Sequence, residues 1–418
     1  MLLLMWLGFS FSLSLEELLQ SALQENPKLL AKGHAIESAR LNLKADRQLY
    51  YPEFLAGYKL HLQQEGQSIQ IPSFAGFPVT EVSTSKRTYQ SLQVGLRQSL
   101  YDGGLRSSKV QISKSFLNIS EMDYEETLLS VKLEVVEAYL SALSALELLE
   151  VAKKQREAIA SNLKQREAFF KEGLVAITDV LQAKVRLAEV ERDLRQAEGN
   201  YRTALSNLSR LTGIKEEKLK ELKPPLLEPS IPKLESLTEK ALQNRPIIRL
   251  TKERLRIAKN QKDIELSQLY PKLFVEALYS YSDQNPALSP KGTFVLSAGL
   301  SLNFQSLYPY YRALAQAEEE KRAREELRDV IDSVLLSLKV AYENYLTAKD
   351  NLRVAEESLR FAEEFYRLSL EQYKNQIISG TDLLQAEASL TQARKAKVIA
   401  YYELLKAYYQ VLRQVGDL

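Results

Sequence analysis

The sequence contains no cysteine and only two histidines, His34 and His61. It therefore has no disulfides, no thiolate zinc site and no cysteine nucleophile, and it has few side chains for a histidine-rich metal site or a Ser-His-Asp relay. Glycine (15) and proline (13) are also scarce among 418 residues, which argues against a disordered or linker-rich chain. The 56 basic and 54 acidic residues leave a net charge of +2, which excludes a strongly basic nucleic-acid binder.

Motifs for catalysis are also missing from the sequence. There is no glycine-rich phosphate loop and no metal-ligand cluster. The many carboxylates lie at spacings typical of solvated ion pairs on helices. We therefore expect neither an enzyme nor a bound cofactor.

The first fourteen residues carry no charge and are mostly apolar, but they are too short to span a bilayer as a helix. They end in small residues, Ser10, Ser12 and Ser14, spaced as at a signal-peptidase site, although a positive n-region is missing. We expect 1–14 to be a signal peptide. The alternatives are a buried N-terminal helix or a misassigned start codon. Nowhere else is an apolar run long enough for a transmembrane helix.

The sequence repeats itself, and the repeats decide the expected architecture. Ala-Leu-Gln-Glu-Asn-Pro at 22–27 recurs as Ala-Leu-Gln-Asn-Arg-Pro at 241–246, an offset of 219. Thr-Asp-Val-Leu-Gln-Ala at 178–183 recurs as Thr-Asp-Leu-Leu-Gln-Ala at 381–386, an offset of 203. The smaller offset indicates a longer loop in the first copy. We place the copies at 15–213 and 234–418.

A proline-rich segment joins the two copies. It covers 214–233 and holds four of the thirteen prolines within nine residues, at Pro224, Pro225, Pro229 and Pro232. Such a density of proline predicts an extended linker.

Each copy has two segments in which apolar and polar residues alternate with period two. In the clearest of them, Phe294, Leu296 and Ala298 alternate with Val295, Ser297 and Gly299, so that one face is apolar and the other mostly polar. This alternation predicts strands with one apolar face, each close to the length that crosses a bilayer as a tilted strand. The predicted strands are at about 52–63, 88–101, 271–282 and 293–304.

The rest of each copy has the periodicity of long helices. Leu338, Tyr345 and Leu352 stand seven residues apart, and the pattern continues on both sides. A sustained period of 3.5 predicts coiled-coil packing. The long helices are expected at about 105–171, 178–213, 307–374 and 381–414.

Four membrane strands per chain predict an oligomer. Open sheet edges are not tolerated in lipid, and single-chain barrels begin at eight strands. Two chains would give eight strands around a filled interior, whereas three would give twelve and leave room for a pore. The expected fold is therefore mainly α with a membrane β-barrel, built from a duplicated helix–β-hairpin–helix repeat.

The turn Gly173-Leu174-Val175-Ala176-Ile177-Thr178-Asp179-Val180 and the phrase Leu100-Tyr101-Asp102-Gly103-Gly104, together with the duplicated plan, identify a family. The chain resembles the TolC-like outer-membrane efflux family over nearly its whole length. The resemblance implies a homotrimer with a 12-stranded barrel in outer-membrane lipid and a coiled-coil α-barrel crossing the periplasm. It implies the exit duct of a tripartite efflux or type I secretion system, with a periplasmic adaptor and an inner-membrane pump as partners and no nucleic acid.

The resemblance also implies two sites. The first comprises the adaptor-contacting turns, made of Gly173, Leu174, Val175, Ala176, Ile177, Thr178, Gln376, Ile377, Ile378, Ser379, Gly380 and Thr381. A simpler interpretation of these turns is helix capping by Thr178 or Asp179 and by Thr381 or Asp382. The second turn departs from the family, because Gln376 replaces a glycine and Ile378 replaces an arginine of the network that holds the tunnel shut.

The second site is the constriction, implied at Asp382, Gln385, Asp179 and Tyr373. The family places two acidic residues one turn apart here, whereas this chain has Asp382 followed by Gln385. Three copies of Asp382 would form a carboxylate ring that attracts cations. The alternative is that Asp382 only caps its helix.

The competing hypothesis for the whole chain is a periplasmic coiled-coil scaffold or adaptor. Such a protein has no use for four strands of bilayer-crossing length with one apolar face, and an adaptor should also have lipoyl-like and barrel domains. The strands therefore favour the channel.

Overall fold

A computed structural model describes residues 13–72, 76, 78–224, 229–303, 306–375 and 377–418. The chain divides into two compact units, each assembled from segments that are distant in the sequence. The first unit takes in the chain up to His34 together with Met122–Arg249 and Arg328–Leu418, and the second takes in Ala35–Glu121 and Leu250–Leu327. Both copies of the repeat contribute to both units.

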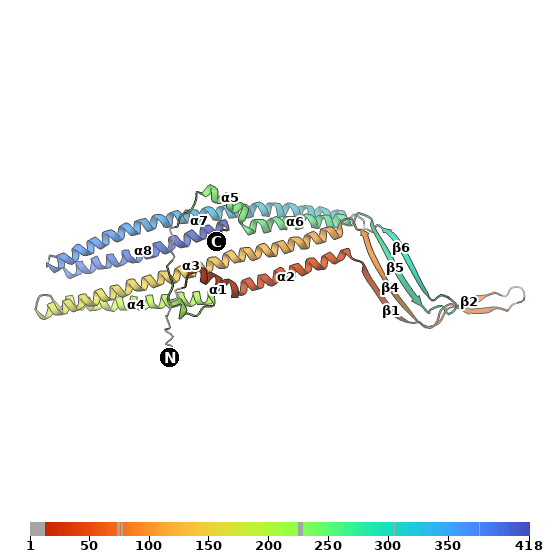
Figure 1. Cartoon of the computed structure of the whole chain (residues 1–418), viewed down its shortest axis with the longest axis horizontal. Coiled ribbons are helices and arrows are strands. Elements are labelled where there is room, and N and C mark those ends of the chain that lie inside the picture. The colour runs from red at the N-terminus through yellow and green to blue at the C-terminus, as the bar shows by residue number, and fades with distance from the viewer. Residues whose placement is uncertain (1–12, 73–75, 77, 225–228, 304–305, 376) are drawn as a thin grey trace, which may run out of the picture. The chain divides into compact units, whose positions relative to one another are not determined.

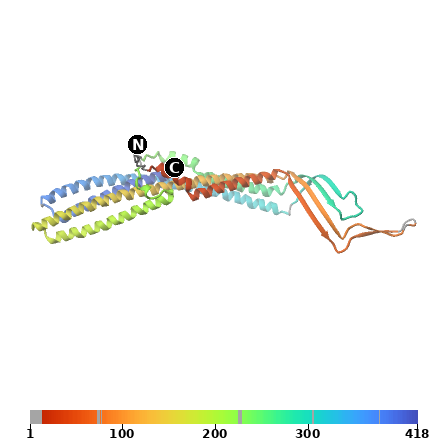
Figure 2. The same cartoon turned by 60° about the horizontal axis from the view of Figure 1, so that its bottom comes forward.

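The first unit is helical. Within it the α3–α4 and α7–α8 pairs run as antiparallel hairpins (Figures 1 and 2). Its elements are α1 (Leu15–Glu25), most of α3 (Leu105–Lys171), α4 (Ile177–Thr212), the 3₁₀ turn η2 (Lys218–Lys220), α5 (Leu234–Asn244), most of α7 (Tyr308–Lys374) and α8 (Gly380–Val415). In the part of the chain that the structure describes, no helix combines the length and apolarity needed to cross a membrane.

One hydrophobic core holds the first unit together. Leu18 of α1, Leu140 of α3, Leu208 of α4 and Leu405 of α8 are all fully buried in it. The seven-residue spacing places apolar side chains along one face of each helix, where they pack against the neighbouring helices. Burying one leucine side chain in this way contributes about 1.5–3 kcal/mol.

Polar contacts run along the line where α3 meets α8, which we call the α3–α8 seam. The Tyr402 hydroxyl donates to Glu147 Oε1 (2.7 Å), and Gln410 Nε2 donates to Glu137 Oε1 (2.9 Å). Arg413 Nη2 donates to Glu126 Oε1 (2.9 Å). These bonds join the α7–α8 hairpin to the α3–α4 hairpin.

The second unit contains the β-structure. Its main sheet is antiparallel in the order β1-β4-β5-β6, and the outer edges of β1 and β6 have no partner among the described strands. Its elements are α2 (Pro27–Arg47, from Ala35), η1 (Gln48–Tyr50), β1 (Glu53–Leu62), β2 (Ser68–Ile71), β3 (Thr80–Ser83), β4 (Thr88–Tyr101), α6 (Pro246–Ser267, from Leu250), β5 (Lys272–Ser282), β6 (Gly292–Ser301) and the first turns of α3 and α7.

The strand register sorts the side chains of the main sheet into two faces. Phe54 stands opposite Leu96, which stands opposite Ala277, which stands opposite Leu296. The next row, on the other face, places Arg97 opposite Glu276 and Glu276 opposite Ser297. Because successive strand residues point to opposite faces, the sheet has an apolar face and a polar face, with Phe54 and Leu296 largely exposed in the single chain.

The longer loop expected in the first copy is not a loop throughout. The structure places a two-stranded antiparallel ribbon there, in which β2 pairs with β3 and Ile69 stands opposite Val82. Each strand has only four residues, so the alternation is too short to stand out from a polar loop. The main sheet keeps the four strands expected per chain.

Asp102 and Gly103, in the motif at 100–104, form the junction between β4 and α3. The Asp102 carboxylate accepts from the backbone N–H groups of Gly104 (3.2 Å) and Arg106 (3.1 Å) at the start of α3. Gly103 has φ +69°, and a Cβ there would lie 2.7 Å from the Ser267 carbonyl oxygen. The aspartate therefore begins the helix, and the glycine permits the close approach of α6.

Most of the expected signal peptide, 1–12, lies outside the described residues. Ser14, at its end, caps α1: its hydroxyl accepts from Glu17 N–H (3.3 Å), and Glu17 accepts from Ser14 N–H (2.9 Å). The expected linker 214–233 is not extended throughout, because η2 lies within it.

Candidate functional site

The first candidate turn joins α3 to α4. Leu174 N–H donates to the Phe169 carbonyl (2.9 Å) and Gly173 N–H to the Phe170 carbonyl (3.0 Å), while Gly173 has φ +72°. This is a glycine-terminated helix end, which needs the left-handed conformation that other residues adopt at a cost. The turn leaves Leu174 59% exposed.

The second candidate turn joins α7 to α8 and repeats the first. Ile377 N–H donates to the Gln372 carbonyl (2.9 Å), which is the counterpart of the Leu174 bond at the offset of 203. Ile377 is 69% exposed, so each turn presents an aliphatic side chain to solvent. Gln376, the residue in place of a glycine, lies outside the described residues.

The capping residues expected at these turns were wrong. The N-cap of α4 is Ala176, which makes no side-chain bond, rather than Thr178 or Asp179. The N-cap of α8 is Ser379, rather than Thr381 or Asp382. Both N-caps have extended backbone angles, and the residues that follow are already helical, so the expected residues lie in the first turn.

Asp382 takes part in capping from the third helical position. Ser379 Oγ (2.7 Å) and Ser379 N–H (3.0 Å) both donate to Asp382 Oδ2, and Asp382 N–H donates to Ser379 Oγ (3.2 Å). These bonds favour the carboxylate and lower the pKa of Asp382 below its ordinary value. Asp382 and Gln385 are both exposed, one turn apart. Asp382 is therefore a solvent-facing anion held at a fixed place.

Arg166 of α3, which was not among the predicted site residues, brings several of them together. Its side chain is 1% exposed. Nη2 donates to the Gly380 carbonyl (2.7 Å) and Nη1 to the Asp179 carbonyl (3.3 Å). Its guanidinium carbon lies 5.9 Å from the centroid of the Tyr373 ring. One buried cation thus contacts the beginnings of α4 and α8 and the end of α7.

A second buried ionisable group lies on the α3–α8 seam. Glu387 of α8 is 6% exposed, and burial raises the pKa of its carboxyl from 4.5 to about 7, although Arg186 opposes the shift. Among the described residues, neither Glu387 Oε1 nor Gln155 Oε1 has a hydrogen-bond partner. Both residues line one cavity of about 300 Å³, together with Tyr366 of α7.

An apolar groove lies between α4 and α8 beside the turns. Its volume is about 520 Å³. Leu181, Val185 and Leu384 supply its aliphatic lining, and Arg186 and Glu189 also line it. Leu181 and Val185 are largely exposed in the single chain. Exposed aliphatic residues rimmed by charges are typical of a surface that packs against another chain.

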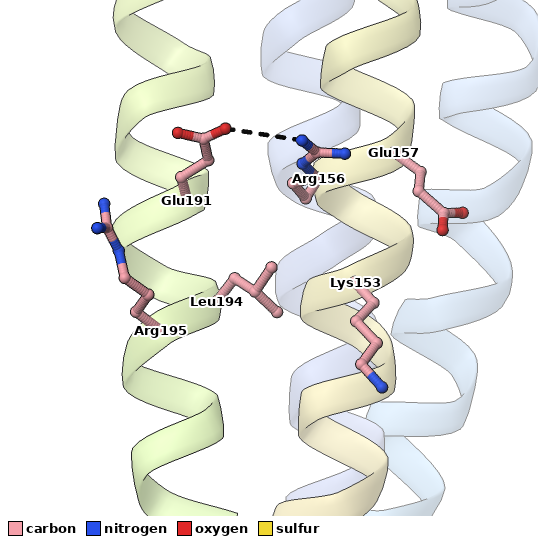
Figure 3. A pocket seen from close by; sticks show the side chains of 6 residues that line it. All are labelled: Lys153, Arg156, Glu157, Glu191, Leu194 and Arg195. Carbon is pink, nitrogen blue, oxygen red and sulfur yellow. Dashed lines mark ion pairs between the residues drawn. The ribbon is translucent and has the colours of Figure 1, made fainter.

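A second hollow, between α3 and α4, is lined mainly by residues that carry a charge (Figure 3). Figure 3 shows its lining residues, which are Lys153, Arg156 and Glu157 on α3 and Glu191, Leu194 and Arg195 on α4. The hollow has a volume of about 430 Å³. Arg156 Nη2 and Glu191 Oε1 are 3.8 Å apart and exposed, an ion pair worth little in water. In the described ranges, no three His, Asp or Glu side chains group in a way that could hold a metal.

A family model described as outer membrane efflux protein matches residues 18–214 and 237–417. The chain belongs to this family. The predicted resemblance is thereby confirmed, and the two matched segments follow the two copies of the repeat.

Named relatives have modest sequence identity. The chain is 25% identical over 278 residues to outer membrane protein TolC of Vibrio cholerae, covering 65% of this chain and 59% of the relative. It is 27% identical over 209 residues to TolC of Escherichia coli, covering 49% of this chain and 40% of the relative. The matches thus span between two fifths and three fifths of the length of these two relatives.

Solved structures extend the likeness to the whole fold. The outer membrane protein VceC of Vibrio cholerae has a TM-score of 0.80 at 16% identity, covering 96% of both chains. The CmeC outer membrane channel of Campylobacter jejuni has a TM-score of 0.79 at 20% identity, covering 96% of this chain and 85% of that one. The predicted fold class, mainly helical with a four-stranded sheet per chain, is confirmed.

Proposed function

We propose that three copies of this chain form an outer-membrane channel, the exit duct of a tripartite efflux or type I secretion system. The main sheet carries this proposal. It has one apolar face, one polar face and two outer edges without a partner among the described strands. A soluble scaffold or adaptor would leave that apolar face in water. The likeness of this chain, over nearly its whole length, to a solved outer membrane channel supports the same conclusion.

Closure of the sheet supports three copies. In lipid, the free edges of β1 and β6 must find partners, and pairing β6 of one chain with β1 of the next supplies them. Three chains with four strands each make a twelve-stranded barrel, wide enough for a water-filled lumen. Lys59, Arg97 and Glu276 lie on the polar face and would line that lumen.

The helical turns are proposed as the docking site of a periplasmic adaptor, which connects the duct to an inner-membrane pump. Leu174 and Ile377 are exposed at the two turns, and the apolar groove lined by Leu181 and Val185 lies beside them. An amphipathic helix from another chain would cover such a groove with its own aliphatic stripe.

A mass and conductance measurement tests the proposal. We expect the protein, extracted from outer membranes in detergent, to have three times the mass of the processed chain, which is 47.6 kDa before the expected signal peptide is removed. In planar bilayers it should form ion-conducting channels. A stable monomer recovered from the soluble fraction would contradict the barrel, and a trimer without conductance would contradict the duct.

Asp382→Asn should reduce the cation preference of these channels, and Gln385→Asp should increase it. The reason is that three copies of Asp382 are proposed to ring the entrance, where carboxylates attract cations and a second ring would add to the first. Reversal potentials in a salt gradient measure both effects. Ser379→Ala is the matched control, because it weakens the helix cap but keeps the carboxylate. If Asp382→Asn leaves selectivity unchanged, Asp382 is only a capping residue.

A further inference from the structure

Arg166 is a buried cation whose hydrogen bonds within the described part of the chain all go to neutral oxygens. Nε donates to Asn162 Oδ1 (2.7 Å), and the Nη atoms donate to the carbonyls of Asp179 and Gly380. A guanidinium stays charged at all physiological pH values. Taking it out of water without a carboxylate partner costs several kcal/mol of desolvation. A side chain this costly is not explained by packing alone.

The two carbonyls do not depend on Arg166 to be satisfied. Asp179 and Gly380 are in the first turns of α4 and α8, so their carbonyls also accept the regular intrahelical bonds. Arg166 supplies an additional bond to each helix. Its effect is therefore to fix where two helices begin relative to α3.

Gly380 is shaped to accept this contact. A Cβ at position 380 would lie 2.7 Å from Arg166 Nη2 and 2.8 Å from its guanidinium carbon. The repeat does not duplicate the arrangement, because the counterpart of Arg166 at the offset of 203 is Ser369, which is too short to reach across. We call the hydrogen bond from Arg166 to the Gly380 carbonyl the tie. It joins the α3–α4 hairpin to the α7–α8 hairpin, and among the residues that the structure describes Ser369 forms no equivalent contact in the other direction.

We propose that Arg166 is a positioning residue that fastens the beginning of α8 to α3 and so holds Asp382, two residues beyond Gly380, in a narrow entrance. The proposal rests on the proposed channel function. Without the tie, the α7–α8 hairpin is free to move away from α3, and the entrance widens.

Arg166→Met tests the proposal, with Arg156→Met as the matched control on the same helix. Arg156 is exposed, and its one ion pair among the described residues is the long one with Glu191. Hydrogen bonds to a charged group contribute about 1.5–3 kcal/mol each, so losing them should raise the open probability at low voltage by about tenfold or more. We expect a lower cation preference as well, with an unchanged trimer mass and no change in the control. Arg166→Lys should restore part of the closure.

A measurement that does not require conductance separates this inference from the channel function. Because the chain has no cysteine, Gln165→Cys and Gln385→Cys introduce one pair of spin labels per chain, at exposed positions on α3 and α8, and mixing labelled with excess unlabelled chains before assembly leaves about one labelled chain per trimer. The distance distribution between the labels should be narrow in the parent and broad with Arg166→Met. Wild-type distances and open probability in a trimeric Arg166→Met protein would overturn the proposal, whereas a narrow distribution in a parent that does not conduct would contradict only the channel.

If the Arg166→Met protein does not assemble, Gly380→Ala provides a second test of the proposal. The added methyl group pushes against the guanidinium while every hydrogen-bonding group is kept. Raised open probability and a broadened label distance support the tie, and wild-type values for both overturn it.

Discussion

Leu296→Arg should prevent assembly in the outer membrane, whereas Ser297→Arg should leave it intact. The two residues are neighbours on β6, but Leu296 is in the apolar row with Ala277, and Ser297 is opposite Glu276 in the polar row. An arginine facing lipid near the bilayer midplane costs about 2–4 kcal/mol in a membrane barrel. A barrel of three chains carries the substitution three times. At position 297 the arginine would face the lumen, beside a carboxylate.

Recovery of folded trimer from outer-membrane fractions measures this difference. Leu296→Ala serves as a second control, because it removes the leucine without adding a charge, and it should assemble. Equal recovery of Leu296→Arg and Ser297→Arg would mean that the two faces of β6 do not differ in environment. The lipid-facing assignment of the apolar row would then be wrong.

The fold class could be predicted because its signals are local and repeated. Strand alternation such as Phe294, Leu296 and Ala298 has a period of two, and the leucines and tyrosines from Leu338 onward have a period of seven. Each period corresponds to one backbone geometry, so the pattern indicates the element directly. What a bilayer demands of sheet edges then predicts an oligomer, whereas the number three is implied by the resemblance to the family.

The helix caps could not be chosen from composition alone. Ser379, Thr381 and Asp382 are all capping residue types within four positions, and each would begin the helix in a different register. The structure begins α8 after Ser379 because that register lets Ser379 and Asp382 bond each other's backbone N–H groups. At the other turn, Ala176 shows that a helix can begin without a side-chain cap.

Arg166 and Glu387 left only a faint signal in the sequence. Arg166 is seven residues after Ile159 and fourteen after Ala152, both buried, so it occupies a core position of α3. Its partners, however, come from other helices, and neither the Gly380 nor the Asp179 carbonyl has a signature in the sequence. Glu387 likewise sits between the buried Ala386 and Leu390 on a face that only packing defines.

Glu387→Gln should make the helical unit more stable at pH 8 and have a much smaller effect at pH 5. The carboxyl is buried and has a pKa of about 7 in the folded chain, against an ordinary value of 4.5. A carboxyl whose pKa is higher in the folded state binds its proton more tightly there. Its contribution to stability is therefore complete below about pH 4.5 and is lost as the pH rises through 7.

The size of the effect follows from the shift. Each pKa unit corresponds to about 1.4 kcal/mol, so the free energy of unfolding should fall by up to about 3 kcal/mol per chain between pH 4.5 and 7. Glutamine is neutral throughout and has nearly the same shape, so it removes this pH dependence. The groups facing Glu387 are Lys154 of α3, Arg186 of α4, Glu363 and Tyr366 of α7, and Arg394 of α8. Two of the cations, Lys154 and Arg394, belong to side chains that reach solvent, so they compensate the buried carboxylate only in part.

Thermal unfolding followed by helical circular dichroism, at equal protein concentration and scan rate from pH 5 to 8, checks the prediction. Glu363→Gln is the matched control. It removes a carboxylate from the same cavity, but the side chain is 54% exposed and lies 4.0 Å from Arg394, so the change should be below about 1 kcal/mol at every pH. The wild type and the control should lose stability in parallel as the pH rises, while Glu387→Gln stays level. If Glu387→Gln follows the wild-type curve instead, the carboxylate has a partner or a route to water when ionised, and the seam does not respond to pH through this residue.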